Sequence, residues 1–112
     1  MRNPPKTQGI PASHYTKEYY YSHEFYHSAG EYDQFIKGGK PAHVYLRALS
    51  YIKQSKRATY LDIGCGKGEL VIHLARLGMS AIGVDYAKAA IEICQDVLKK
   101  EKVAVKSLLN SK

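Results

Sequence analysis

The chain has 112 residues, a formal net charge of +7 and two cysteines, which suits one soluble domain and excludes a disulfide-stapled fold. No apolar run is long enough to cross a bilayer, and the polar, proline-rich residues 1–11 do not resemble a signal peptide. We therefore expect a cytoplasmic protein with free thiols and no membrane partner. The Lys and Arg residues are scattered, so a solvated surface is favoured over nucleic-acid binding.

A tyrosine-rich stretch comes first. Its members are Tyr15, Tyr19, Tyr20, Tyr21, Tyr26 and Tyr32. Tyrosines that pack a small lid explain this composition more simply than a binding role for any one of them. An amphipathic helix is predicted over residues 41–54, because the apolar positions recur on one helical face. These positions are Ala42, Tyr45, Leu46, Leu49 and Ile52.

The same stretch contains His23-Glu24-Phe25-Tyr26-His27, a literal H-E-x-x-H pattern. On a helix, His23 and His27 would share a face and could bind zinc, with Glu24 as the general base. Only 22 residues precede His23, too few for the sheet that walls a zinc-protease cleft, and no methionine falls where a Met-turn would be. A zinc metalloprotease is therefore only a distant alternative.

A β-type run at residues 59–63 passes directly into a glycine-rich turn. Asp62 is followed at every second position by a glycine: Gly64, Gly66 and Gly68. A dinucleotide turn needs G-x-G-x-x-G, and a P-loop needs Gly-Lys followed by Ser or Thr, so neither template fits. Such a turn lets a small ligand lie against main-chain N–H groups near the positive end of the following helix. Cys65, between two of the glycines, has no visible base nearby and is interpreted as a tolerated small residue.

A helix, a strand and a second helix follow the turn. The first helix is predicted over residues 69–77, because leucines recur at helical spacing before Gly78. A β-type run at residues 81–84 ends at Asp85, and Tyr86 follows it. The second helix is predicted from about residue 87 to residue 100, and a third strand over residues 103–109.

The D-x-G-x-G-x-G pattern, with a second acidic residue ending the next strand, resembles the first two motifs of the class I S-adenosylmethionine-dependent methyltransferases. The resemblance covers residues 60–98 firmly. It implies an α/β, Rossmann-like fold, here a partial parallel sheet with its strands in the order 3-2-1 and an N-terminal helical lid. Residues 1–57 would form the lid, and residues 58–112 would form the N-terminal half of the cofactor-binding domain.

The resemblance also implies S-adenosyl-L-methionine as the cofactor and assigns residues to its parts. Asp62 would hold the methionine amino group, and Asp85 would accept hydrogen bonds from both ribose hydroxyls. Tyr86 would lie against the adenine. Tyr19 or Tyr20 would face the sulfonium, and we choose Tyr20. The main chain of the turn would approach the cofactor closely at Gly64, Cys65, Gly66 and Gly68. No catalytic residue can be named.

The expected activity is methyl transfer to an unidentified, small-molecule acceptor, and the alternative is a non-catalytic module that binds the cofactor or a partner. Only the first three of the seven strands of the family can be assigned, so we expect the N-terminal half of a longer enzyme. The strand at residues 59–63, central in the complete fold, would then have an unpaired edge and uncovered apolar side chains. We expect self-association at that edge or a poorly stable chain, and coverage of the edge by the tyrosine-rich N-terminal segment is the alternative.

Overall fold

The computed structural model describes residues 9–21 and 29–111. The N-terminal elements are all helical: η1 (Ala12–His14), α1 (Lys17–Tyr21), α2 (Ala29–Ile36) and α3 (His43–Ser50). Strands and helices then alternate: β1 (Thr59–Ile63), α4 (Glu69–Arg76), β2 (Ser80–Asp85), α5 (Lys88–Glu101) and β3 (Ser107–Asn110).

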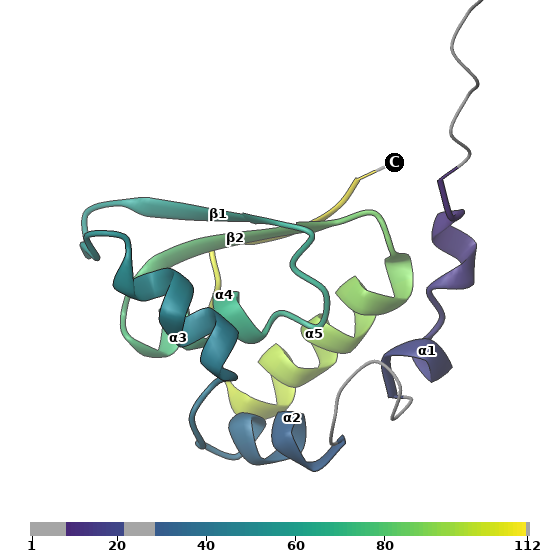
Figure 1. Ribbon diagram of the computed structural model, residues 1–112, viewed down its shortest axis with the longest axis horizontal. Helices are drawn as coiled ribbons and strands as arrows, with labels where there is room; N and C mark the ends of the chain where they lie inside the picture. The colour runs from purple at the N-terminus through teal and green to yellow at the C-terminus, as the bar shows by residue number, and fades with distance from the viewer. Residues whose placement is uncertain (1–8, 22–28, 112) are drawn as a thin grey trace, which may run out of the picture.

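The strands form one parallel sheet in the order β1-β2-β3 (Figure 1). Leu61 pairs with Ile82 of β2, which in turn pairs with Ser107 of β3. Helix α4 connects β1 to β2, and α5 connects β2 to β3. This arrangement confirms the predicted α/β fold and the predicted strand order.

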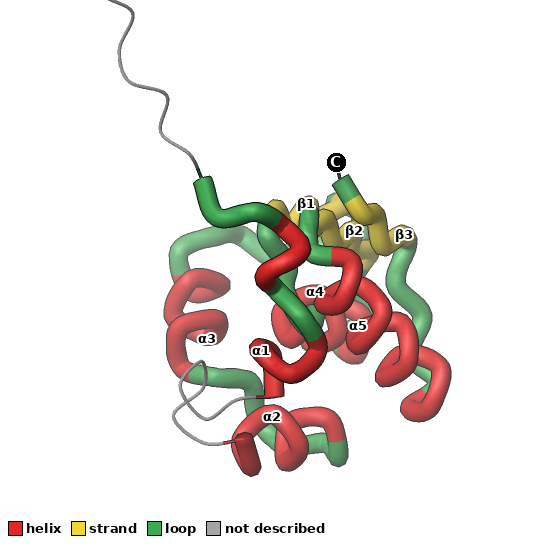
Figure 2. Tube along the Cα trace, turned by 90° about the vertical axis from the view of Figure 1, so that its right-hand side faces the viewer, coloured by secondary structure: helices red, strands yellow, loops and turns green. Residues whose placement is uncertain are grey.

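The described helices all lie on one side of the sheet, as two perpendicular views show (Figures 1 and 2). Side chains alternate between the faces of a strand, and in β2 the buried residues are Ala81, Gly83 and Asp85. Two of these three are small, which lets the helical layer come close. A Cβ atom at Gly83 would lie 2.9 Å from the Cys65 Sγ and 3.0 Å from the Leu108 Cδ2.

One hydrophobic core joins the N-terminal helices to the sheet layer. Tyr32, Phe35 and Leu49 from α2 and α3 pack in the same cluster as residues of α4, β2 and α5. The partners are Val71, Ile72, Leu74, Ala81 and Cys94. The predicted lid is therefore packed into the core of the domain, and its boundary after residue 57 stays a prediction.

Two elements differ from their predicted bounds. Helix α3 is shorter than residues 41–54, and Ile52, expected on its buried face, lies beyond its end and is 46% exposed. Strand β3 begins at Ser107 instead of residue 103. Lys102 adopts a left-handed conformation with φ of 52° after α5, so the residues that follow it are used to return the chain to the sheet.

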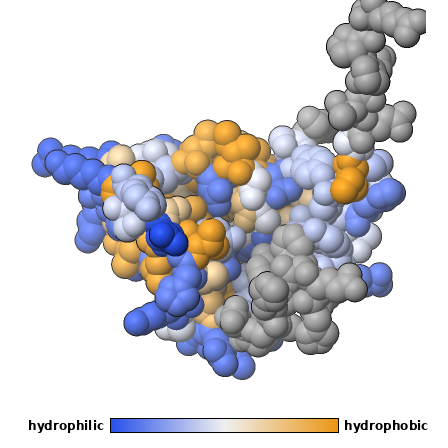
Figure 3. Space-filling model, in the orientation of Figure 1, coloured by the Kyte–Doolittle hydropathy of each residue, from blue (hydrophilic) through white to orange (hydrophobic). Residues whose placement is uncertain are grey.

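The sheet face opposite the helices is apolar and open. Ile63 is 78% exposed, Leu61 59% and Leu109 52%, and Ile82 and Val84 of β2 lie between them. Hydrophobic residues are visible along the top of the molecule, where the strands lie (Figure 3). Strand β1 pairs only with β2 among the described residues, so its other edge is unpaired there. The expected uncovered side chains of the first strand are thus confirmed.

No helix within the described ranges combines the length and the apolar character needed to span a membrane. Both cysteines are free, as expected, and the structure shows that both are buried.

We expect the open sheet face to drive self-association of this chain in water. Contiguous exposed apolar surface and an unpaired strand edge both favour pairing with a second copy. Ile63→Lys should shift the population toward monomer at micromolar concentration, measured by size-exclusion chromatography with light scattering. Val44→Lys is the matched control, because Val44 is 68% exposed on α3, away from the sheet. A monomeric parent chain would contradict the expectation.

Candidate functional site

The turn after β1 has a backbone that only glycine adopts without strain. Gly64, Gly66 and Gly68 have φ values of 77°, 56° and 84°. These values lie in the left-handed region, which is conformationally strained for any residue with a side chain. The glycine spacing in the sequence thus reflects three residues with positive φ, at every second position between β1 and α4.

The N–H groups of this turn are directed into the protein. Those of Gly64 and Cys65 donate to the Val84 carbonyl at 2.7 and 2.9 Å, and that of Gly68 donates to the Cys65 carbonyl at 3.0 Å. The Gly66 N–H donates to the Asp85 Oδ2 at 2.8 Å. The sequence-based expectation that such N–H groups face a ligand is therefore wrong for these four, because the end of β2 supplies their acceptors.

The glycines instead leave room for a ligand. A Cβ atom at Gly64 or at Gly66 would meet nothing within 4 Å, so the main chain is bare on that side. Gly68 differs, because its Cβ atom would lie 2.2 Å from the Cys94 Sγ. The first two glycines border open space, and the third allows α4 to pack against α5.

The Cys65 side chain points away from that open space. It is 4% exposed and lies under Gly83. Burial, followed by the proximity of Cys94, Asp62 and Asp85, raises the pKa of its thiol to about 12. A thiol that stays protonated is a poor nucleophile. The interpretation of Cys65 as a small packing residue agrees with this position, and only its main chain borders the turn.

Asp85 is 7% exposed and connects the two loops at this end of the sheet. Its Oδ2 accepts the Gly66 N–H, and its Oδ1 accepts the Ala87 N–H at 2.8 Å. A carboxylate has about four acceptor positions, so two remain for a ligand such as a ribose diol. Asp85 therefore has a structural role in addition to the binding role expected for it.

Asp62 is only half-buried, and its carboxylate makes no hydrogen bond within the described part of the chain. Its register partner on β2 is Gly83, so its side chain lies on the same sheet face as that of Asp85. Desolvation, and then the negative charge of Asp85, raise the pKa of Asp62. A cationic ligand group next to Asp62 would relieve this unfavourable charge.

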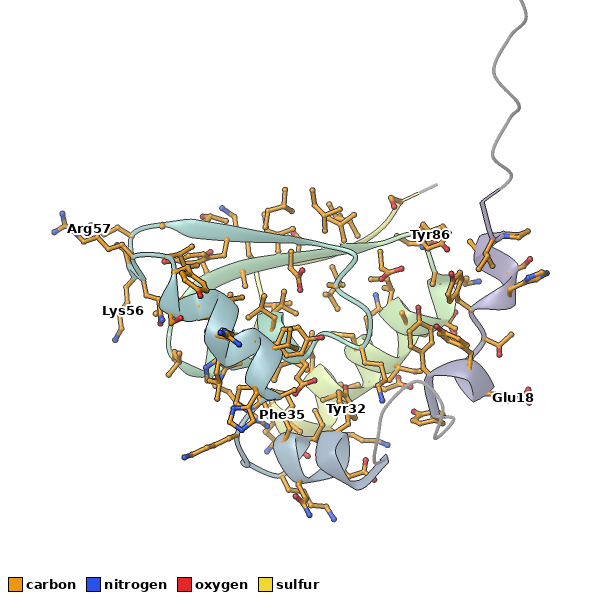
Figure 4. The ribbon with its side chains drawn as sticks, viewed as in Figure 1. Glu18, Tyr32, Phe35, Lys56, Arg57 and Tyr86 are labelled. Carbon is orange, nitrogen blue, oxygen red and sulfur yellow. The ribbon has the colours of Figure 1, made fainter. Side chains whose placement is uncertain are left out.

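The two predicted aromatic residues lie at the carboxyl end of β2. Tyr86, labelled in Figure 4, is partly exposed. Its ring centroid lies 5.4 Å from that of Tyr15. Tyr20 is 4% exposed and packs against Ala87, Ala90 and Ile93, close enough to Asp85 for its charge to add to burial in raising the pKa of Tyr20. Contact of either tyrosine with a ligand stays a prediction.

The sequence did not identify the groups that hold the N-terminal helices to the turn. The Tyr32 hydroxyl donates to the Lys67 carbonyl at 3.0 Å, and the Lys67 Nζ lies 3.9 Å from the centroid of the Tyr32 ring. The Glu69 Oε1 accepts the Ala42 N–H at 2.7 Å. Lys67 is 3% exposed, and burial lowers its pKa against the opposing charges of Asp33 and Glu69. The only sign of these contacts in the sequence is the pair of charged residues, Lys67 and Glu69, on either side of Gly68.

The opposite end of α4 is fastened to α2. The Arg76 guanidinium donates to the carbonyls of Phe35, at 2.7 Å, and of Ile36. Basic groups that bond the last carbonyls of a helix are a common way to end it. Figure 4 shows Tyr32 and Phe35 on α2, from which they contact the helical layer.

The H-E-x-x-H segment lies outside the described residues, so its helix and its zinc site are not described. Among the residues that the structure does describe, no three His, Cys, Asp or Glu side chains gather where they could hold a metal ion.

A family model described as a methyltransferase domain matches residues 54–109. Over 92 residues the chain is 36% identical to EEF1A lysine methyltransferase 2 of Danio rerio, covering 77% of this chain and 40% of that protein. Over 53 residues it is 42% identical to the ubiquinone biosynthesis O-methyltransferase of Pelagibacter ubique (strain HTCC1062), covering 47% of this chain and 22% of that protein. The chain thus spans less than half the length of these relatives.

Solved structures support the fold. The TehB-like SAM-dependent methyltransferase of Corynebacterium glutamicum is similar over 90% of this chain and 47% of its own, with a TM-score of 0.55 and 18% identity. Coclaurine N-methyltransferase, solved with N-methylheliamine and SAH, is similar over 62% of this chain and 21% of its own, with a TM-score of 0.56 and 15% identity. At these identities the likeness concerns the fold alone.

Asp62→Asn should stabilise the ligand-free chain at neutral pH. The raised pKa means that the folded state binds the Asp62 proton more tightly than the unfolded state. Its contribution to stability is full below the unfolded pKa and is lost as pH rises through the folded pKa. The variant should therefore melt higher than the parent at pH 7, and the difference should vanish in acid.

Thermal unfolding followed by circular dichroism at several pH values measures this effect. Asp96→Asn is the control, since Asp96 is exposed on α5 and its replacement should change the melting temperature little. A lower melting temperature for Asp62→Asn at pH 7 would show that its carboxylate makes a favourable contact.

Gly68→Ala should cost more stability than Gly66→Ala. Both positions have positive φ, but only Gly68 is enclosed, with the Cys94 Sγ where the new methyl group must go. Overpacking of this kind costs about 1–3 kcal/mol beyond the backbone strain that the two variants share. Urea unfolding of both variants measures the difference. Equal losses would mean that backbone strain alone decides the cost.

Proposed function

This chain belongs to the methyltransferase domain family, with the class I Rossmann-like fold, and we propose that it binds S-adenosylmethionine beside the glycine turn. The observation that carries this proposal is the Asp62 carboxylate, which makes no hydrogen bond to the residues that the structure describes. It lies next to the bare main chain of Gly64 and Gly66, where a Cβ atom would meet nothing within 4 Å. The ammonium group of the cofactor would supply a positive partner for the Asp62 carboxylate. The two glycines would leave room for the rest of its methionine part. The residues present thus fit the expected cofactor.

The remaining parts of the cofactor follow from the order of the residues along this end of the sheet. Asp85, at the end of β2, offers its two free acceptor positions to the ribose hydroxyls. Tyr86 follows it and offers a partly exposed ring to the adenine. The lid tyrosine Tyr20 lies close to Asp85, and we retain it as the residue that faces the sulfonium.

The proposed reaction is methyl transfer from the sulfonium to a nucleophilic acceptor. The carbon–sulfur bond breaks as the acceptor–carbon bond forms, the sulfur keeps the electron pair as a thioether, and the acceptor loses a proton. The protein would contribute position and a site with little water, which are the main aids to an in-line displacement. No residue is assigned as a base.

The acceptor class is proposed only in broad terms. The relatives include an enzyme named for lysine methylation and one named for O-methylation in ubiquinone biosynthesis. We retain a small molecule as the proposed acceptor and the cytoplasm as the proposed compartment. A non-catalytic module that binds the cofactor remains the second function, and turnover by the chain would exclude it.

The chain should bind S-adenosylhomocysteine more tightly than NAD, because the turn lacks the extra residue of a dinucleotide motif. Isothermal titration calorimetry with both ligands tests this prediction.

Asp85→Asn replaces one acceptor oxygen by a donor, so it should weaken binding at least about tenfold, the value of one hydrogen bond to a charged group.

Because Asp85 also holds Gly66 and Ala87, this variant needs a stability measurement beside its affinity. Asp96→Asn serves again as the matched surface control. Preferential binding of NAD would contradict the assignment, and so would the absence of binding by a folded sample.

A further inference from the structure

Tyr45 lies on the side of α3 that faces the start of α4. The Ala42 N–H just before α3 donates to the Glu69 Oε1 at 2.7 Å, which places this end of α3 beside the first residue of α4. The Tyr45 N–H donates to the Ala42 carbonyl at 3.0 Å, so Tyr45 follows Ala42 by one helical turn. Residues three apart lie on the same side of a helix, and Glu69, Asp62 and Cys65 all lie close enough to act on the Tyr45 hydroxyl. Tyr45 is therefore on the side of α3 toward the glycine turn.

The surroundings of Tyr45 keep its hydroxyl protonated. Burial, followed by the charges of Glu69 and Asp62 and the proximity of Cys65, raises the pKa of Tyr45 to about 12. At neutral pH the phenol is thus a hydrogen-bond donor. Within the described residues its hydroxyl makes no hydrogen bond to the protein, although the side chain is half-buried.

Two half-buried polar groups of opposite kind are therefore available near the glycine turn. Asp62 can accept, and Tyr45 can donate. The amino-acid end of S-adenosylmethionine carries an ammonium group, which needs an acceptor, and a carboxylate, which needs a donor. Four N–H groups of the glycine turn already have acceptors inside the protein, so the turn offers few donors for that carboxylate.

We propose that the Tyr45 hydroxyl donates a hydrogen bond to the carboxylate of the cofactor, while Asp62 holds its ammonium group. This inference rests on the proposed function and adds a positioning residue to it. Tyr45 fixes the amino-acid end of the methyl donor and does not touch the acceptor. The N-terminal helices thereby contribute a contact to the cofactor through α3.

The test compares two ligands that differ only in the carboxylate: S-adenosylhomocysteine and its decarboxylated analogue, which keeps the ammonium group. Tyr45→Phe removes the hydroxyl and keeps the ring. We expect about a tenfold loss of affinity for S-adenosylhomocysteine, the effect of one hydrogen bond to a charged group, and no change for the analogue. Titration calorimetry measures both affinities.

Tyr51→Phe is the matched control, because Tyr51 follows α3 directly and is 77% exposed, and it should alter neither affinity. Equal losses for both ligands in Tyr45→Phe would mean that the ring only supports the fold, and unchanged affinity for S-adenosylhomocysteine would mean that the hydroxyl does not bind it. Either result overturns the inference. If the parent chain binds neither ligand, the proposed function fails first. Any general damage to the fold would lower both affinities together, so the ratio between the ligands still decides.

Discussion

The geometry at the carboxyl end of the sheet depends on one carboxylate, that of Asp85. It accepts the Gly66 N–H on one side and the Ala87 N–H on the other, and so joins the turn before α4 to the turn before α5. Burial of a carboxylate is costly unless hydrogen bonds compensate for its lost hydration, and these two N–H groups supply that compensation. The same residue thus sets the shape of the glycine turn and presents its remaining lone pairs outward. The proposed ribose contact of Asp85 would therefore be coupled to folding.

The N-terminal helices are attached to the same turn. Tyr32 bonds the carbonyl of Lys67 and covers its amine, and the Ala42 N–H bonds Glu69. At the far end of α4, Arg76 bonds the last carbonyls of α2. Because these contacts hold both ends of α4, a shift of α2 or α3 would move the turn as well. The N-terminal helices and the glycine turn are therefore joined through both ends of α4.

The sequence predicted the regular elements well, because their signals are local. Glycine spacing, an alternating strand and leucines at helical intervals predicted β1, α4, β2 and α5 to within a few residues. The partners of each polar group were not predictable, since they depend on contacts distant in the chain. Asp62 and Asp85 both lie near the carboxyl end of a strand, yet only Asp85 accepts hydrogen bonds from two N–H groups among the described residues. The sequence pattern identifies Tyr45 only as an apolar position of a helix. A role for its hydroxyl depends on the position of α3 beside Glu69, which the sequence does not show.

The two thiols beneath the glycine turn offer a way to measure the motion of this turn. Cys65 is covered by Gly83, and Cys94 fills the place next to Gly68, so a reagent can reach either sulfur only when the turn separates from the layer below. Chemical labelling of these cysteines would therefore count opening events of the turn. The rate of this labelling would report how often the turn opens, and the two native cysteines would serve as the probes.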